Sequence, residues 1–119
     1  MYRGTFSQDK GDLPVASKKD KVIREIKTLV KTLGEKGISI KVAYLFGSYA
    51  RGNPNEWSDI DILLVSDNFC GIRFYDVEKL LPLTRGYNNL IEFHPLKTED
   101  FNTKDLFIKE ILDTGIRIR

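Results

Sequence analysis

Two aspartates stand at alternate positions at the beginning of an otherwise apolar run, DIDILLV, which spans residues 59–65. The aliphatic and β-branched residues of this run predict a β-strand. Because alternate residues of a strand share a face, Asp59 and Asp61 are expected on one face, about 7 Å apart at Cα, with Ile60 and Ile62 facing the core. Unpaired charges are costly in such a strand, so a positive charge is expected beside the two carboxylates.

A divalent cation would supply the charge that the two aspartates require. Oxygen-only ligands suit Mg²⁺ or Mn²⁺, and two carboxylates on one face can converge on one ion or on a pair of ions. The alternative is that Asp59 caps the beginning of the strand while Asp61 faces water at a sheet edge. The D-x-D pattern alone is too short to distinguish the two interpretations.

The residues that precede the aspartates favour the metal interpretation. An apolar strand is expected to end at Gly47-Ser48, where exposed backbone N–H groups and a residue without a Cβ let a phosphate approach the chain. The Ser48 hydroxyl adds a donor, and Arg51 adds a cation on the same turn. Each feature alone fits a strand-ending turn or a surface charge. Together they describe an anion pocket beside a metal pocket, which is what a metal-bound nucleoside triphosphate needs.

A third acidic residue, Glu92, stands in the apolar segment LIEFH at residues 90–94. If this predicted strand lies next to the aspartate strand, about 4.8 Å away, Glu92 reaches the same face. Three carboxylates around two cations would support in-line displacement at phosphorus, with Glu92 as a ligand or as the acceptor of the hydroxyl proton. His94 shares the face of Glu92 and could contact a phosphate or the acceptor, although a strand-end polar residue is the more common role. Trp57 could stack on the base or pack over the sheet edge.

The periodicity of the remaining chain predicts a small sheet with helices packed against it, an α/β or α+β fold. Residues 1–16 are expected to form a loose N-terminal arm, and residues 17–119 one domain. Ser17 is the expected N-cap of the first helix, and Pro95 is expected to end the third strand. The predicted helices span residues 17–33, 75–83 and 103–114, with a helical turn at 49–52. The predicted strands span residues 38–46, 59–65 and 90–94, and the final IRIR could add an edge strand or contact a partner.

Composition limits the classes of protein to which the chain can belong. With 119 residues, 41% hydrophobic and 30% charged, it has the composition of a folded globular domain. Cys70 is the only cysteine, which excludes an intrachain disulfide and a cysteine-based zinc cluster and fits a reducing cytoplasm. No apolar run could span a bilayer and no signal-peptide pattern is present, so a cytoplasmic location without membrane contact is expected. A net charge of +2 neither requires nor excludes nucleic acid.

The spacing of the two motifs resembles the signature of a known superfamily. Gly47-Ser48, ten intervening residues and Asp59-Ile60-Asp61, with apolar flanks, resemble the signature of the polymerase-beta-like nucleotidyltransferases. Within that superfamily, the stretch from about residue 22 to residue 119 is most similar to the minimal nucleotidyltransferases encoded beside HEPN-domain proteins. The resemblance implies a nucleotidyltransferase fold built on a small mixed sheet flanked by helices.

The resemblance also implies roles for individual residues. It implies two Mg²⁺ ions as cofactors and ATP as the substrate. Six residues would carry these functions: Asp59, Asp61 and Glu92 as catalytic residues and metal ligands, and Gly47, Ser48 and Arg51 as nucleotide-binding residues.

The same resemblance implies Mg²⁺-dependent transfer of AMP from ATP to a hydroxyl group. Family members paired with HEPN toxins act as antitoxins, and some adenylylate a tyrosine of the toxin, so the expected partner is a HEPN-domain protein in a type VII-like toxin–antitoxin system. Larger relatives carry further domains that hold the acceptor, whereas this chain stops at Arg119, which favours a protein acceptor over nucleic acid or an antibiotic. The alternatives are an antitoxin that neutralises its partner by complex formation without catalysis, and a small-molecule nucleotidyltransferase.

Overall fold

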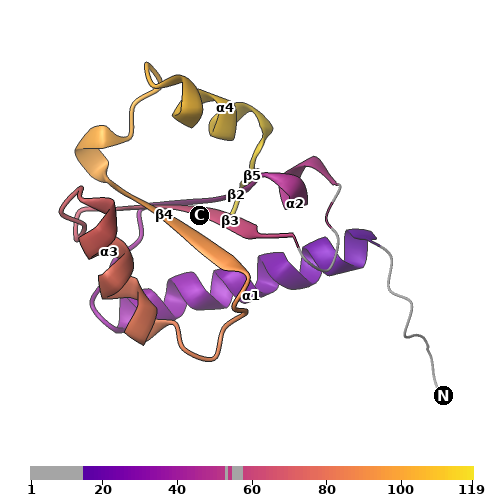
Figure 1. Cartoon of the computed structure of the whole chain (residues 1–119), viewed down its shortest axis with the longest axis horizontal. Coiled ribbons are helices and arrows are strands. Elements are labelled where there is room, and N and C mark those ends of the chain that lie inside the picture. Colours follow the sequence, from indigo (N-terminus) through magenta and orange to yellow (C-terminus); the bar gives the residue numbers. More distant parts are fainter. Residues whose placement is uncertain (1–14, 53, 55–57) are drawn as a thin grey trace.

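The computed structural model describes residues 15–52, 54 and 58–119, which form a mixed sheet with helices on both faces (Figure 1). The strands lie in the order β4 (Ile91–Lys97), β3 (Ile60–Ser66), β2 (Val42–Phe46) and β5 (Ile116–Arg117). β3 pairs with β2 in antiparallel and with β4 in parallel orientation, and β2 pairs with β5 in antiparallel orientation. The predicted small mixed sheet flanked by helices is therefore confirmed.

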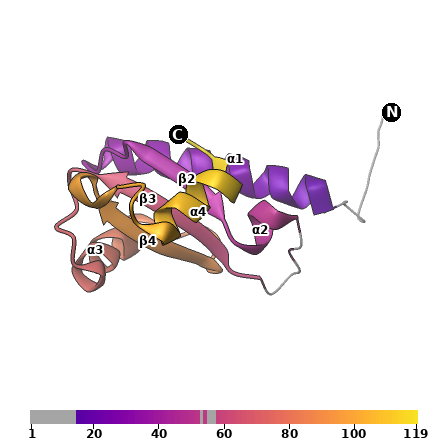
Figure 2. The same ribbon diagram turned by 90° about the horizontal axis from the view of Figure 1, so that it is seen from above.

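Helices cover the two faces of the sheet (Figure 2). α1 (Val15–Glu35) and α3 (Arg73–Leu80) pack on one face, where alternate residues of β3 such as Ile62 join the larger core. α4 (Leu106–Thr114) lies on the other face, where its Ile111 joins a smaller core with residues of β2 and β3. β3 is thus a central strand with both faces covered, which explains why its sequence is a nearly continuous apolar run.

The first helix extends further than the sequence predicts. α1 begins at Val15, so Ser17 lies inside the helix rather than at its N-cap, and the helix continues to Glu35 before Gly37 adopts a φ of +97°. Residues 1–14 of the predicted arm lie outside the described residues. None of the helices described combines the length and the apolar character that a membrane span requires. The apolar residues that recur at helical spacing face the core, with Ile23 partly buried and the following side chains buried: Val22, Ile26, Leu29, Val30 and Leu33.

The segment before β2 is buried without being a strand. The sequence predicts a strand from Ile38, but β2 begins at Val42. Ser39 accounts for the difference, because its N–H donates to Asn68 Oδ1 (2.9 Å) and its carbonyl accepts from Ser66 Oγ (2.6 Å). Side chains therefore satisfy the backbone groups that a strand would pair in a ladder, while both isoleucines of the segment stay buried.

The two edge strands of the sheet, β4 and β5, compare differently with the sequence predictions. Pro95 does not end the third predicted strand, because β4 continues to Lys97 with Pro95 opposite Leu64 of β3. β4 is an edge strand, and an edge strand tolerates proline since one of its sides needs no ladder hydrogen bonds. At the other edge, Ile116 and Arg117 of the alternating IRIR segment form the strand β5, one of the two roles that the sequence left open.

Helix boundaries differ from the prediction where local capping decides them. α3 ends at Leu80, before the 3₁₀ turn η2 (Leu81–Leu83), and Leu81, which the helical spacing places toward the core, is 55% exposed. α4 begins at Leu106 rather than at residue 103. Asp105 caps it, because its carboxylate accepts hydrogen bonds from two backbone N–H groups of the first turn.

A buried carboxylate fixes the loop between β3 and α3. Asp76 is 2% exposed, and its two oxygens accept hydrogen bonds from the backbone N–H groups of Cys70 (2.8 Å) and Gly71 (2.9 Å). These charge-assisted bonds satisfy the carboxylate and two backbone donors together. The loop that leads into α3 is therefore held in one conformation by a side chain of α3 itself.

Replacing Asp76 by Ala is expected to lower the free energy of unfolding by about 2–4 kcal/mol, because two backbone donors lose their acceptor. Denaturant titration followed by circular dichroism measures the change. Asp113→Asn is the matched control, since Asp113 is exposed and pairs with Lys109 across one helical turn, an interaction worth at most about 0.5 kcal/mol. Equal losses in the two variants would contradict the structural role of Asp76.

Candidate active site

Asp61 and Glu92 lie side by side because of the strand register. β3 and β4 are parallel with Asp61 opposite Glu92, and Phe46 of β2 lies opposite Asp61 on its other side. The two carboxylate side chains are 22% and 46% exposed, so a small ligand can reach both. The strand neighbour on which the prediction for Glu92 depended is therefore present.

His94 forms a cluster with the two acids. One ligand atom from each of Asp61, Glu92 and His94 lies within 4.8 Å of the other two, and His94 Nε2 is 3.2 Å from Asp61 Oδ1. The His94 ring packs edge-on against Phe46, with ring centroids 4.9 Å apart. His94 lies inside β4 rather than at its end, so the strand-end interpretation is wrong. Its offset of two residues from Glu92 was the signal that places both on one face.

Arg73 joins this cluster from α3, and the sequence analysis did not select it. Its Nη2 lies 3.4 Å from Glu92 Oε2, and its Nη1 lies 3.3 Å from His94 Nδ1. Because β4 is an edge strand, a long side chain from the first residue of α3 can reach around it. No local motif marks Arg73, since the contact depends on the conformation of the loop that precedes α3.

Asp59 stands apart from the cluster. It lies one residue before β3, is exposed, and is absent from the described group whose ligand atoms lie within 4.8 Å. Residues two apart in an extended chain are separated by about 7 Å at Cα, so Asp59 can bind the same ion as Asp61 or a neighbouring one without touching it. Asp59 stays a predicted ligand. Trp57, for which stacking on the base or packing over the sheet edge is predicted, lies outside the described residues.

Gly47 lies directly against the Asp61 carboxylate. β2 ends at Phe46, Gly47 has a φ of +76°, and α2 (Ser48–Arg51) begins at the next residue. A Cβ added to Gly47 would lie 2.5 Å from Asp61 Oδ2, a separation that real Cβ atoms do not show. Glycine is required here both by the left-handed backbone and by the neighbouring carboxylate. The side chain that approaches Gly47 in the structure is thus Asp61.

Ser48 and Arg51 follow Gly47 on α2. Ser48 is half-buried and Arg51 is exposed at the end of the helix. Gly47 and Arg51 help to line a pocket of about 180 Å³ that borders the cluster through Gly47. The rest of its lining comes from β2 and α4: Phe46, Phe107, Glu110, Ile111 and Thr114.

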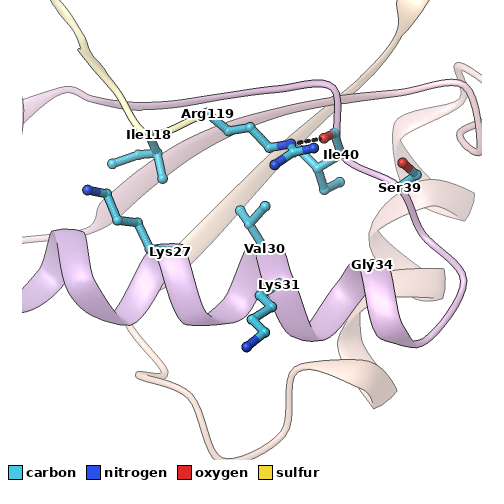
Figure 3. A pocket seen from close by; sticks show the side chains of 8 residues that line it. All are labelled: Lys27, Val30, Lys31, Gly34, Ser39, Ile40, Ile118 and Arg119. Carbon is cyan, nitrogen blue, oxygen red and sulfur yellow. Dashed lines mark hydrogen bonds between the residues drawn. The ribbon is translucent and has the colours of Figure 1, made fainter.

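A larger pocket lies on the α1 side of the sheet (Figure 3). Its volume is about 310 Å³, and α1, the segment before β2 and the C-terminal residues enclose it. Arg119 lies across it and donates from Nε to the carbonyl of Ile40 (2.6 Å), and Lys27 and Lys31 extend from α1. None of the eight side chains drawn around it is a carboxylate. This pocket therefore lacks the ligands for a divalent cation, which belong to the opposite face.

The cluster on the α4 face has the chemistry of a divalent-cation site. Asp61 and Glu92 offer partly exposed carboxylate oxygens, the hard ligands that Mg²⁺ and Mn²⁺ prefer. His94 contacts Asp61 from the side, as hydrogen-bonding groups around metal ligands commonly do. Arg73 supplies positive charge beside Glu92. The residues present therefore fit a bound divalent cation.

Comparison with known proteins identifies the family. The family model described as "Polymerase beta, Nucleotidyltransferase" matches residues 25–119, a range that contains the whole cluster. The chain belongs to this nucleotidyltransferase family. The resemblance inferred from the two sequence motifs is confirmed, and the nucleotidyltransferase fold with it.

Other proteins are similar to this nucleotidyltransferase over most of its length. The "Putative protein adenylyltransferase MJ0604" of Methanocaldococcus jannaschii is 38% identical over 77 residues, which cover 64% of this chain and 75% of that protein. The crystal structure of a "putative nucleotidyltransferase from Sulfolobus solfataricus" has a TM-score of 0.60 at 22% identity, covering 90% of this chain and 88% of that chain. A crystal structure described as "the toxin-antitoxin with AMP-PNP" has a TM-score of 0.52 at 22% identity, covering 80% and 72%. The two structural likenesses show a shared fold.

Proposed function

We propose that this nucleotidyltransferase transfers AMP from ATP to a hydroxyl group of a partner protein. Family membership supports nucleotidyl transfer. The 38% identity to a protein described as a putative protein adenylyltransferase supports a protein as the acceptor. The observation that carries the proposal is the pairing of Asp61 with Glu92 across parallel strands, with Gly47 packed against the Asp61 carboxylate.

In the proposed reaction the acceptor oxygen forms a bond to the α-phosphorus of ATP, the bond to the bridging oxygen breaks, and pyrophosphate leaves. Two Mg²⁺ ions, held by Asp59, Asp61 and Glu92, would activate the hydroxyl and neutralise the triphosphate when bound. Gly47, Ser48 and Arg51 bind and orient the triphosphate on the α2 side of the cluster. The hydroxyl proton passes to Glu92, the more exposed of the two paired carboxylates.

The acceptor in this proposal is a HEPN-domain toxin, with this chain as its antitoxin in a type VII-like system. The support is the resemblance of the GS and DID motifs to those of the minimal nucleotidyltransferases. The fold is also shared with a protein in a structure described as a toxin–antitoxin with AMP-PNP. The reaction would take place in the cytoplasm, with which the single Cys70 is compatible. Modification of the toxin by AMP would then be the antitoxic act.

The test is incubation of the purified protein with Mg²⁺ and ATP labelled at the α-phosphate, with and without the HEPN-domain protein encoded beside it. Intact-protein mass spectrometry is expected to show a gain of one or more AMP units on the partner, lost when Mg²⁺ is chelated. A stable complex that silences the partner without any mass gain would contradict the proposal in favour of a binding antitoxin. Transfer to a small molecule in the absence of the partner would favour a small-molecule enzyme instead.

A further inference from the structure

Arg73 brings a fixed positive charge to the carboxylate cluster. Its guanidinium contacts Glu92 Oε2 at 3.4 Å and His94 Nδ1 at 3.3 Å. Asp61 and Glu92 place two carboxylates within 4.8 Å of each other, and their mutual repulsion is relieved when a cation lies between or beside them. The guanidinium therefore lies beside the pair of carboxylates at which a divalent cation is expected to bind.

The contacts of His94 define which ring nitrogen carries its proton. A guanidinium offers donors alone, so Arg73 donates and His94 Nδ1 accepts. The proton of the neutral ring is then on Nε2, which donates to Asp61 Oδ1 at 3.2 Å. A ring nitrogen that carries a proton cannot bind a metal ion. In this arrangement His94 holds Asp61 as a hydrogen-bond donor and is not itself a ligand.

The loop that presents Arg73 is anchored by two sets of contacts. The buried Asp76 accepts from the N–H groups of Cys70 and Gly71, just before Arg73 in the chain. Gly71 has a φ of +93°, and a Cβ added there would lie 3.0 Å from carbons of Lys97 on β4, so this loop packs closely on the edge strand. The Arg73 side chain itself is 53% exposed, so the guanidinium can leave the carboxylates while its backbone stays in place.

We propose that Arg73 is a positioning residue that takes the place of the divalent cation while none is bound. Its charge neutralises Glu92 directly, and its contact with His94 orients the ring that hydrogen-bonds to Asp61. Both carboxylates are thereby kept in their ligating positions. A divalent cation then binds in competition with the guanidinium, so the site has a lower affinity for the ion alone than its carboxylates would otherwise give. The inference rests on the proposed function, because that function places a divalent cation at these carboxylates.

Titration of the nucleotide-free protein with Mn²⁺, followed by the loss of the free-ion EPR signal, tests this role. Arg73→Ala is expected to bind Mn²⁺ roughly two- to fivefold more tightly than the wild type, since one exposed ion contact is worth up to about 1 kcal/mol, or fivefold in affinity. Arg73→Lys keeps the charge but cannot contact Glu92 and His94 with one planar guanidinium. Its Mn²⁺ affinity is therefore expected to fall between that of the wild type and that of Arg73→Ala.

Arg85→Ala is the matched control for the loss of one exposed arginine. Arg85 lies in the turn after η2, and its removal is expected to leave Mn²⁺ affinity at the wild-type value. Equal or weaker Mn²⁺ binding by Arg73→Ala overturns the proposal, and so does a failure of both proteins to bind the ion. Tighter binding by Arg85→Ala to the same extent would also overturn it, because net charge alone would then explain the effect.

The ring of His94 gives a second readout that a purely structural role of Arg73 would not change. His94 is the only histidine in the sequence, so every imidazole ¹⁵N resonance of the protein belongs to this residue. The proton is expected on Nε2 in the wild type, and Arg73→Ala is expected to shift the Nδ1 resonance. A proton on Nδ1 in the wild type, or an unchanged Nδ1 resonance in the variant, contradicts the arrangement.

The metal titration and the transfer assay separate this inference from the proposed function. Tighter Mn²⁺ binding by Arg73→Ala in a protein that transfers AMP to no acceptor would support the role of Arg73 and refute the function. AMP transfer to the partner together with an unchanged Mn²⁺ affinity in Arg73→Ala would support the function and refute the role of Arg73.

Discussion

Replacing Asp61 by Asn is expected to lower the rate of AMP transfer at least about a thousandfold, measured as the initial rate of label incorporation at saturating ATP and Mg²⁺. The cluster is built around this residue, since Glu92 lies opposite it, His94 donates to it and Gly47 packs against it. Asn keeps the shape of the side chain and removes the charge that would bind a cation in the proposed reaction. Loss of a group that merely orients a metal ligand costs about 10–100-fold, so loss of a ligand itself is expected to exceed that range.

Two controls separate this loss of catalysis from a loss of structure. The melting temperature of Asp61→Asn is expected to stay within about 4 °C of the wild type, because the Asn oxygen can still accept from His94 and repulsion with Glu92 is relieved. Asp100→Asn removes an exposed carboxylate from η3 (Thr98–Asp100), which follows the far end of β4, and is expected to leave transfer unchanged. AMP transfer by Asp61→Asn within tenfold of the wild-type rate would refute the assigned role of the carboxylate.

The position of the cluster could be predicted because it depends on local pattern. Alternation in DIDILLV determines which side chains share a face, and the structure places Ile60 and Ile62 in the larger core as expected. A glycine at the end of an apolar strand indicates a backbone that needs either a positive φ or a close neighbour, and Gly47 has both. The face of each side chain and the need for glycine are both determined by residues a few positions apart in the sequence, so a local sequence pattern can predict them.

Contacts between distant segments could not be derived from the same patterns. Whether Glu92 meets Asp61 depends on which strand lies next to β3, and an apolar segment does not specify its neighbour. Arg73 reaches the cluster because the buried Asp76 fixes the loop before it, and no spacing in the sequence encodes that hydrogen bond. Pro95 was misjudged for a related reason: proline ends a central strand, but the edge position of β4 is a property of the whole sheet.

Replacing Gly47 by Ala is expected to lower the rate of AMP transfer about 100-fold in a protein that still folds. The new Cβ would lie 2.5 Å from Asp61 Oδ2 and 3.4 Å from Asp61 Cγ, so the carboxylate has to move. That movement disturbs its placement beside Glu92 and His94, and a displacement of about 1 Å at a reacting site costs about two orders of magnitude in rate. The φ of +76° with a ψ of −146° adds a backbone strain on the order of 1–3 kcal/mol for a residue with a Cβ.

Gly37→Ala is the matched control, because it also places a Cβ on a residue with a positive φ but without the contact. Gly37 has a φ of +97°, and a Cβ added there meets no atom within 4 Å. Both variants are expected to lose roughly 1–3 kcal/mol in the free energy of unfolding, and Gly47→Ala alone is expected to lose transfer. Equal transfer rates would mean that the Asp61 carboxylate adjusts without consequence. A selective loss in Gly47→Ala would mean that this glycine serves the reaction by leaving room for a metal-binding carboxylate, whatever contact with phosphate it also makes.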